Sequence, residues 1–384
     1  MQRTVFDEDH EAFRSVLREF IATEVVPVYG EWESAGCVPR EFYRKLGKLG
    51  ILGLGIPEEY GGAGETGFRF NAVIAEECAR AGVTFGGASA HLALPATFVK
   101  YTTEEQKRRW LPGFVSGELM TAIAITEPGA GSDVAGIQTT AEPSADGKHL
   151  VLNGVKAFVS GGAQADLVLV TCRTPGSEQD DRRGGLSLIA VDAHAPGVTV
   201  SAEQATIGLR SSDIVEMTFT DVRVPVTDVV GEQGKAFACL ADIFPQERLG
   251  IAVGSYAHAA AAVRFATEYV QERTAFGKPV AAFQNTKFTL ADCKARVDAL
   301  QAVVDRALEA FDAGQLTAEE AASAKLYCAP AAARIVDACL QLHGGYGYTT
   351  EYPIARLYAD IRASQIFGGT NEIMRTIVAK SMGL

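Results

Sequence analysis

The spacing of apolar residues changes twice along the chain, and this limits the possible folds more than any other feature of the sequence. Up to about residue 118 apolar side chains recur at helical intervals, as over 6–24, 42–54 and 70–81. From 121 to 219 the apolar runs are short, rich in β-forming residues and separated by Gly, Pro, Asn or Asp. Beyond about residue 232 helical spacing returns, over 236–276, 284–314, 317–342 and 371–382. Such separate blocks of helices and strands argue against a doubly wound α/β fold.

The pattern therefore predicts an α+β protein in three parts. An α-helical domain is expected over 1–120, an antiparallel sheet or small barrel over 121–230, and a helical domain over 231–384. A chain of 384 residues is long for one core, which fits this division. Thr103 predicts a helix start before two glutamates, and the pairs Asp146-Gly147 and Asn153-Gly154 predict tight turns.

Composition excludes several classes of function. A net charge of -12 argues against general nucleic-acid binding, which requires a basic face. The seven cysteines are scattered, form no CxxC pair and have no histidine at zinc-ligand spacing, so we expect reduced thiols and no metal site. The first residues lack an apolar signal core and no apolar run reaches 18 residues, which predicts a cytoplasmic protein with no membrane association.

Two segments carry chemistry that the composition does not explain. At 124–133 an apolar run breaks into a turn, Ala-Ile-Thr-Glu-Pro-Gly-Ala-Gly-Ser-Asp, whose backbone N–H groups and hydroxyls can face a phosphate, a flavin edge or a thioester. The second segment, 341–372, contains several glycines and ends in Gly-Gly-Thr-Asn-Glu. Three further stretches combine glycine with charged residues. They are Pro-Glu-Glu-Tyr-Gly-Gly at 57–62, Gly-Leu-Arg-Ser-Ser-Asp at 208–213 and Glu-Arg-Thr-Ala-Phe-Gly-Lys-Pro at 272–279.

Together these stretches resemble the acyl-CoA dehydrogenase family over essentially the whole chain. The resemblance implies an N-terminal α-helical domain, a middle antiparallel β-barrel-like domain and a C-terminal four-helix bundle. It also implies non-covalent FAD, a homo-oligomer (a dimer or a tetramer) and electron-transfer flavoprotein as the acceptor. The expected reaction is oxidation of an acyl-CoA thioester to the trans-2-enoyl product, with the β-hydride passing to flavin N5.

This chemistry requires a carboxylate base for the α-proton and hydrogen-bond donors at the thioester carbonyl. Many family members carry the base as a Glu near the C-terminus, but the matching residue here is Gly368. Another branch, which includes long-chain and isovaleryl enzymes, places the Glu about 120 residues earlier, where this chain has Glu247 followed by Arg248. We therefore predict Glu247 as the base. Two alternatives are that Glu247 is an ordinary first-turn glutamate after Pro245, and that Glu372 is the base.

The resemblance also assigns contacts to FAD and substrate. In the middle domain Thr126 is expected at the pyrimidine edge of the flavin, Ser132 at the pyrophosphate or the substrate, and Ser160 at N5 beside the packed ring of Phe158. Arg273 matches an arginine that reaches the pyrophosphate across a subunit interface, where its fork suits phosphate oxygens. The full set of predicted cofactor contacts is Ile125, Thr126, Gly131, Ser132, Phe158, Ser160, Arg273, Phe276, Gln284, Gln341, Gly344, Gly345, Thr370 and Glu372.

For the substrate, Arg248 and Ser132 are expected at the pantetheine arm, and the backbone N–H of Gly369 at the thioester carbonyl. Other readings stay open at this point. Some relatives oxidise acyl groups carried by an acyl carrier protein, whose pantetheine arm is identical to that of CoA. Other relatives with the same fold are oxidases or monooxygenases. Carrier proteins are acidic and usually dock on a basic patch of their enzyme, so a net charge of -12 argues mildly against a carrier-protein substrate. Acyl chain length and branching cannot be read from the sequence.

Overall fold

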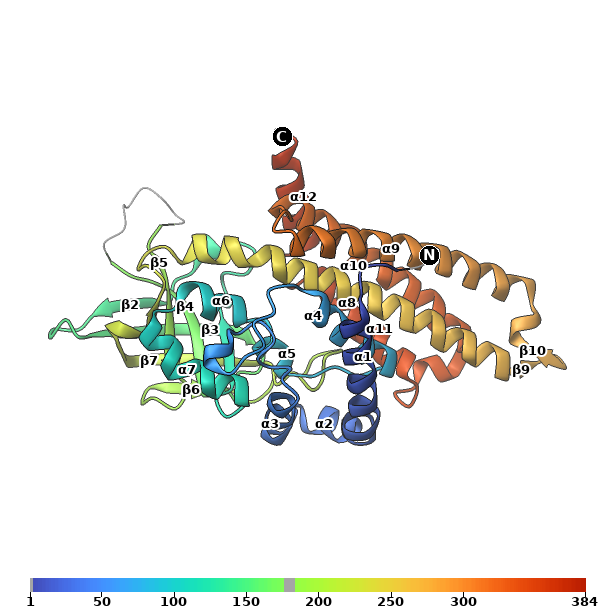
Figure 1. Ribbon diagram of the computed structural model, residues 1–384, viewed down its shortest axis with the longest axis horizontal. Coiled ribbons are helices and arrows are strands. Elements are labelled where there is room, and N and C mark those ends of the chain that lie inside the picture. Colours follow the sequence, from blue (N-terminus) through green and yellow to red (C-terminus); the bar gives the residue numbers. More distant parts are fainter. Residues whose placement is uncertain (1–2, 176–183) are drawn as a thin grey trace.

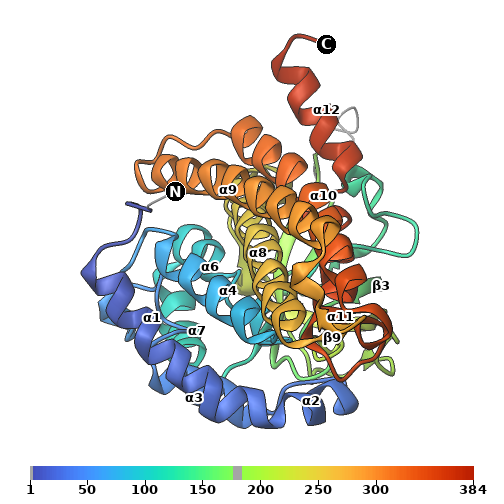
Figure 2. The same cartoon turned by 90° about the vertical axis from the view of Figure 1, so that its right-hand side faces the viewer.

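The computed structural model describes residues 3–175 and 184–384 as an elongated molecule (Figure 1). A sheet domain lies at one end and long, roughly parallel helices extend to the other, with the N-terminal helices packed along one side (Figures 1 and 2). The structure confirms the three-part fold of helices, sheet and helices.

Short helices build the N-terminal part. They are α1 (Glu8–Phe20), α2 (Tyr29–Ala35), α3 (Arg40–Lys48), α4 (Arg69–Ala81), α5 (Ala88–His91), α6 (Pro95–Tyr101) and α7 (Glu104–Ser116). Thr103 caps α7, as predicted: its hydroxyl accepts from the N–H of Gln106, and the Gln106 side chain accepts from the N–H of Thr103. Asp7 caps α1 in the same way, with its carboxylate accepting from Asp9 and His10.

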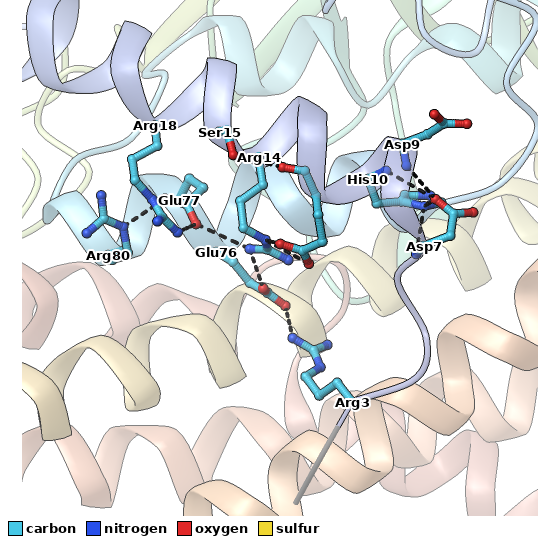
Figure 3. Close-up of polar contacts among 11 residues, drawn as sticks. Arg3, Asp7, Asp9, His10, Arg14, Ser15, Arg18, Glu76, Glu77 and Arg80 are labelled. Atoms are coloured by element: carbon cyan, nitrogen blue, oxygen red, sulfur yellow. Dashed lines mark hydrogen bonds and ion pairs between the residues drawn. The ribbon is translucent and has the colours of Figure 1, made fainter.

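An ion-pair network ties the start of the chain to the body of the molecule (Figure 3). Its members on the N-terminal segment and α4 are Arg3, Arg14, Arg18, Glu76, Glu77 and Arg80. Burial raises the pKa of Glu77, but hydrogen bonds from Arg18, Arg80 and Arg14 prevail and lower it to about 2. Arg3 also donates from Nε at 3.0 Å to Asp305 on helix α9 (Gln284–Asp312), so the network joins the N-terminal part to the C-terminal helices.

Eight strands within the described residues form the middle sheet. They are β1 (Thr121–Ala124), β2 (Thr140–Pro143), β3 (His149–Val159), β4 (Leu167–Arg173), β5 (Leu186–Asp192), β6 (Val198–Val200), β7 (Val215–Pro225) and β8 (Val229–Val230). They pair in the order β6-β7-β3-β2-β4-β5-β8, mostly antiparallel as predicted. The exceptions are β1, which pairs in parallel with the first half of β4, and the single parallel pair between Thr140 and Arg173.

Both faces of the sheet are covered, which explains the unbroken apolar run of β4. Val168 and Val170 face one core within the sheet domain, whereas Leu167 and Leu169 pack in a second core with side chains of α6 and α7. A strand buried on both faces has no solvent side on which to alternate polar residues.

The turn predicted at Asn153-Gly154 is wrong. Both residues lie inside β3, which pairs with β2 up to Asn153 and with β7 on to Val159. Gly154 has a φ of +152°, and a Cβ built there would lie 2.4 Å from Thr139 Oγ1, so the glycine serves close strand approach instead of a turn. The turn at Asp146-Gly147 does form, between β2 and β3.

Four long or medium helices dominate the C-terminal part. They are α8 (Ala236–Glu272), α9 (Gln284–Asp312), α10 (Ala318–Leu342) and α11 (Pro353–Ile361), and they share one apolar core with Ala72 and Ala79 of α4. Between α8 and α9 a hairpin of β9 (Thr274–Ala275) and β10 (Lys278–Pro279) protrudes at the far end of the molecule (Figure 1). Helix α12 (Asn371–Ser381) projects away from the bundle (Figure 2). No helix of the described residues is long and apolar enough to cross a membrane.

Candidate active site

Helix α8 carries Glu247 and Arg248 in its interior. The alternative reading of Glu247 as a first-turn glutamate is wrong, because α8 begins at Ala236 and continues through Pro245. The Glu247 side chain is reached by solvent, yet protein atoms surround it closely enough that burial raises the pKa of its carboxyl. Solvent contact together with close surrounding protein is typical of a group at a concave surface, where a bound molecule can reach it.

The Glu247 carboxylate lies beside Gly368. A Cβ built on Gly368 would lie 3.4 Å from Oε1 of Glu247 and 2.4 Å from Cδ1 of Ile251, one turn further along α8. Gly368 and Gly369 have φ values of +63° and +87°, in the left-handed region that favours glycine. Two positions 121 residues apart in the sequence thus share one location, and the carboxylate at 247 faces the residue that lacks a side chain.

Two buried cations donate hydrogen bonds to the turn at 367–369. Lys325, on α10, donates to the carbonyl oxygens of Phe367 and Gly369. Arg248 donates from Nε to the carbonyl oxygen of Gly368 at 3.5 Å. The C=O and N–H of a trans peptide point in opposite directions, so the N–H of Gly369 points away from Arg248. This orientation leaves the predicted carbonyl-binding donor on the side opposite the guanidinium.

The charged groups of this cluster shift one another's pKa values. Burial raises the pKa of Glu247, while the charges of Lys325 and Arg248 act to lower it. Burial lowers the pKa of Lys325 to about 8, against the opposing effect of the Glu247 carboxylate. The cations therefore favour the ionised carboxylate that burial disfavours.

Arg248 lies where it can position the turn. The residue is buried, and its guanidinium carbon is 5.2 Å from the centroid of the Phe244 ring as well as near Gly368. A contact with the pantetheine arm stays a prediction for Arg248, because its observed partners belong to the protein.

Glu372, the competing carboxylate, lies in a different setting. It is in the first turn of α12, its side chain is 76% exposed, and it forms an ion pair with Arg375 at 2.9 Å. Thr370 precedes it as the cap of α12, accepting from the N–H of Ile373. An exposed, paired carboxylate on a projecting helix is a poor candidate for a base.

The turn that follows β1 carries the first group of predicted cofactor residues. Ile125 and Thr126 are half-buried, while Gly131 and Ser132 are exposed, and a Cβ at Gly131 would meet nothing within 4 Å. Behind the turn, buried Glu127 accepts from Lys156 Nζ at 2.8 Å and from the N–H groups of Gln138 and Thr139. This buried ion pair, which the sequence analysis missed, fixes the turn to β3.

Phe158 is strained and exposed at the end of β3. Its φ is +56°, and 64% of its surface is accessible although it lies in a sheet with two covered faces. The register with β7 shifts between Lys156 and Val159, which marks a bulge that turns the ring outward. The N–H of Ala157 donates to the carbonyl of Thr126 at 2.9 Å, so Phe158 on the strand and half-buried Ser160 just past its end lie beside the β1 turn. Such strain in a bulky residue points to a functional position.

A second group of predicted cofactor residues meets at the far end of the helical bundle. Arg273, Phe276 and Gln284 come from the β9–β10 hairpin and the start of α9. Gln341 lies at the end of α10, and Gly344 and Gly345 lie in the turn that follows it. The guanidinium carbon of Arg273 is 5.8 Å from the ring centroid of Tyr346, which joins the two segments. All six are exposed, and Phe276 has 96% of its surface accessible.

The two groups come from opposite ends of the molecule (Figure 1). The β1 turn and β3 belong to the sheet domain at one end of the molecule, and the hairpin lies at the other (Figure 1). Each group fits part of a dinucleotide. The first offers an exposed aromatic ring, hydroxyls and an open glycine, and the second offers an exposed arginine fork and open glycines at 344 and 345.

Comparison with known proteins identifies the family. Models of the N-terminal, middle and C-terminal domains of acyl-CoA dehydrogenases match residues 7–118, 122–222 and 235–383. The chain belongs to the acyl-CoA dehydrogenase family. The mitochondrial long-chain specific acyl-CoA dehydrogenase of Sus scrofa is 38% identical over 382 residues, which cover 99% of this chain and 88% of the relative.

Solved structures agree. An acyl-CoA dehydrogenase from Geobacillus kaustophilus has a TM-score of 0.95 at 40% identity, covering 100% of both chains. An acyl-CoA dehydrogenase from Bacillus anthracis in complex with FAD has a TM-score of 0.88 at 31% identity, covering 100% of this chain and 69% of the other. A chain in the structure of the electron transferring flavoprotein of Acidaminococcus fermentans has a TM-score of 0.91 at 29% identity, covering 99% of each.

This acyl-CoA dehydrogenase is therefore an FAD-dependent oxidoreductase, and the predicted family, fold, reaction class and cofactor are confirmed. The comparisons favour dehydrogenation of acyl-CoA over the carrier-protein, oxidase and monooxygenase alternatives.

Proposed function

We propose that Glu247 is the base that removes the α-proton of the acyl thioester. The single observation that supports this most strongly is the location of its carboxylate, 3.4 Å from where a Cβ of residue 368 would lie. A base in that location replaces the glutamate that other family members carry at the position of Gly368. Lys325 and Arg248 oppose the rise in the Glu247 pKa that burial causes, and so favour the ionised form that abstracts a proton.

The remaining residues of the cluster orient the substrate. We assign the N–H of Gly369 as the donor to the thioester carbonyl, because the carbonyls on either side are held by Lys325 and the peptide is fixed by Arg248. Bound FAD supplies the acceptor for the β-hydride. Ser132 is assigned to the pyrophosphate or the pantetheine arm, and Arg248 to holding the turn, with a substrate contact as its second role.

We assign the cofactor contacts to the two groups described above. Ile125, Thr126, Gly131, Ser132, Phe158 and Ser160 would hold the flavin half from one subunit. Thr370 and Glu372, at the start of α12, would contact the adenosine half. Arg273, Phe276, Gln284, Gln341, Gly344 and Gly345 would reach the same FAD from a partner subunit. The separation of the groups along the molecule supports at least a dimer, and we propose a homotetramer (Figure 1).

Three further assignments complete the proposal. Electron-transfer flavoprotein is the proposed acceptor, in line with the resemblance of this chain to family members that use it. A cytoplasmic location is supported by seven free cysteines, which suit a reducing compartment. Domain limits of 1–120, 121–230 and 231–384 are supported by the strand and helix blocks, since β1 begins at Thr121 and α8 at Ala236.

Glu247→Gln tests the base. The variant keeps shape and hydrogen bonding but cannot accept a proton, so we expect it to bind FAD and to lose about 10²–10⁴-fold or more of the rate of anaerobic flavin reduction. A panel of acyl-CoAs of different length and branching serves as substrate, and the chain length that bleaches wild-type flavin fastest also identifies the substrate class. Glu309→Gln, which changes an exposed glutamate on α9 that pairs with Arg306, is the matched control and should reduce flavin at nearly the wild-type rate. Near-normal bleaching by Glu247→Gln would refute the assignment.

A further inference from the structure

Lys325 is fully buried in an apolar part of the helical bundle. It lies in α10 among small and apolar neighbours on the same helix, including Ala321, Ala322, Ala324 and Cys328, all of which are buried. Removing an ammonium group from water costs several kcal/mol unless good partners compensate it. A methionine would fill similar space without this cost, so packing alone does not account for a lysine.

The partners of Lys325 lie at the reaction site. Its Nζ donates to the carbonyl oxygens of Phe367 and Gly369, on both sides of the peptide whose N–H faces away from Arg248. Gly368, between them, is the residue against which the Glu247 carboxylate lies. One ammonium group therefore contacts the backbone that presents the carbonyl-binding N–H, and the base lies against the same backbone at Gly368.

We propose that Lys325 is a positioning residue for the dehydrogenation, which holds the 367–369 turn in place and favours the ionised form of Glu247. This inference depends on the proposed role of Glu247 as the base. It adds a residue on a third element, α10, to the two elements that carry the base and the turn.

The charged groups that face Glu247 make the expected effect clear. They are Lys325 from α10 and Arg248 from α8 itself, and both favour the carboxylate form. An opposite charge within about 4–6 Å lowers a carboxyl pKa by roughly 1–3 units. Removing the Lys325 charge therefore raises the pKa of Glu247, so the reaction that needs ionised Glu247 fails at a higher pH than in the wild type.

The test compares two neutral variants of Lys325 in the FAD-bound enzyme. Lys325→Met removes the charge and the donor, whereas Lys325→Gln removes the charge but keeps a donor for a carbonyl of the turn. The rate of flavin reduction is measured across pH with the best acyl-CoA of the panel. We expect the acidic limb of the profile to move up by about one pH unit in both variants. Stability should fall more in Lys325→Met.

A second readout does not need turnover. The protonation of Glu247 can be followed by the infrared carboxyl signal of the substrate-free enzyme, identified as the titrating band that is absent in Glu247→Gln. This band should titrate at higher pH in both Lys325 variants. Lys294→Met, which neutralises an exposed lysine on α9 that pairs with Asp298, is the matched control and should leave both profiles unchanged.

Each outcome decides the question. Profiles and carboxyl titrations that coincide with the wild type would overturn the proposal, even if the variants unfold more easily, because Lys325 would then be structural only. If Glu247→Gln stays active, the proposed base fails, while the infrared titration still reports separately whether Lys325 acts on Glu247.

Discussion

Gly368 and Glu247 form the site as a pair. The glycine has a φ of +63°, and its missing side chain leaves the space beside the carboxylate on α8. An alanine here would need a left-handed backbone, which costs an L-residue about 1–2 kcal/mol, and its Cβ would press on Cδ1 of Ile251 at 2.4 Å. The absence of a side chain at 368 is thus required by the same packing that admits a base at 247.

We therefore expect Gly368→Ala to lower the free energy of unfolding by more than Gly314→Ala. Gly314 has a similar φ of +66°, but a Cβ there would meet nothing within 4 Å, so it reports the backbone cost alone. The control should lose about 1 kcal/mol, and Gly368→Ala roughly another 1 kcal/mol because Ile251 must change rotamer. Urea unfolding with saturating FAD measures both. Equal losses would show that Ile251 yields without cost and that the packing argument is wrong.

At the scale of elements, strand β3 holds the flavin turn by a buried ion pair. The side chain of Lys156 is fully buried. Its Nζ donates to Glu127 at 2.8 Å and to the carbonyl of Ile125 at 3.0 Å. Glu127 in turn accepts from Thr139, close to β2. The pair joins β1, β2 and β3 just behind Thr126, where the flavin is assigned.

Lys156→Met should destabilise the protein by about 3 kcal/mol, because it leaves the Glu127 carboxylate buried without a cation. We also expect weaker FAD binding, since the turn at 125–132 loses its attachment to β3. The double variant Lys156→Met with Glu127→Gln should lose less than the sum of the two single losses. Urea unfolding and FAD titration measure these effects. Strict additivity would indicate that the two side chains are stabilised independently of one another.

The helical elements were predictable from the sequence, and the two lysines were not. Helices α8, α9 and α10 lie within a few residues of the spans expected from apolar spacing, because each presents a continuous apolar face to one core. Lys156 and Lys325 are single charges within apolar patterns, and such residues are more often exposed than buried. Their partners are carbonyls and a glutamate brought close only by tertiary contacts, so a local pattern could not reveal them.

Within the site, the family resemblance supplied Glu247 and the structure explains its location. Periodicity alone would have left Glu247 as an ordinary helical glutamate, since the 121 residues between 247 and 368 hide their proximity. Tertiary contacts also explain why the predicted turn at Asn153-Gly154 does not form. The pair has turn chemistry, but pairing of β3 with β2 and β7 on both sides overrides it, and the glycine instead accommodates Thr139.

At the scale of the whole molecule, the long axis separates the two halves of the assigned cofactor site. Strand β3 and the turn after β1 belong to the sheet end, while the β9–β10 hairpin lies at the other end (Figure 1). Thr126 and Phe158 belong to the first of these, and Arg273 and Gln341 to the segments at the second. In a closed symmetric dimer each end of one subunit can meet the opposite end of its partner. Every complete site would then take its base from one chain and its pyrophosphate arginine from the other.

This arrangement predicts complementation between two inactive variants. Glu247→Gln lacks the base, and Arg273→Ala lacks the arginine that the partner receives. In a mixed dimer one site has both defects, but the other has an intact Glu247 and an intact partner arginine. Random co-assembly of equal amounts should therefore restore about a quarter of wild-type activity per site, from two parents that are each inactive or weak. Acyl-CoA turnover after co-refolding or co-expression measures it.

The control mixes Arg273→Ala with Gln284→Ala, two changes at the same end of the molecule. Mixed dimers of these variants contain a defective partner contribution at every site, so their activity should not exceed the mean of the parents. Restoration in the first mixture and not in the second would require that opposite ends of two chains build one FAD site. Activity no greater than the parental mean in both mixtures would contradict the shared site, because each chain would then complete its own.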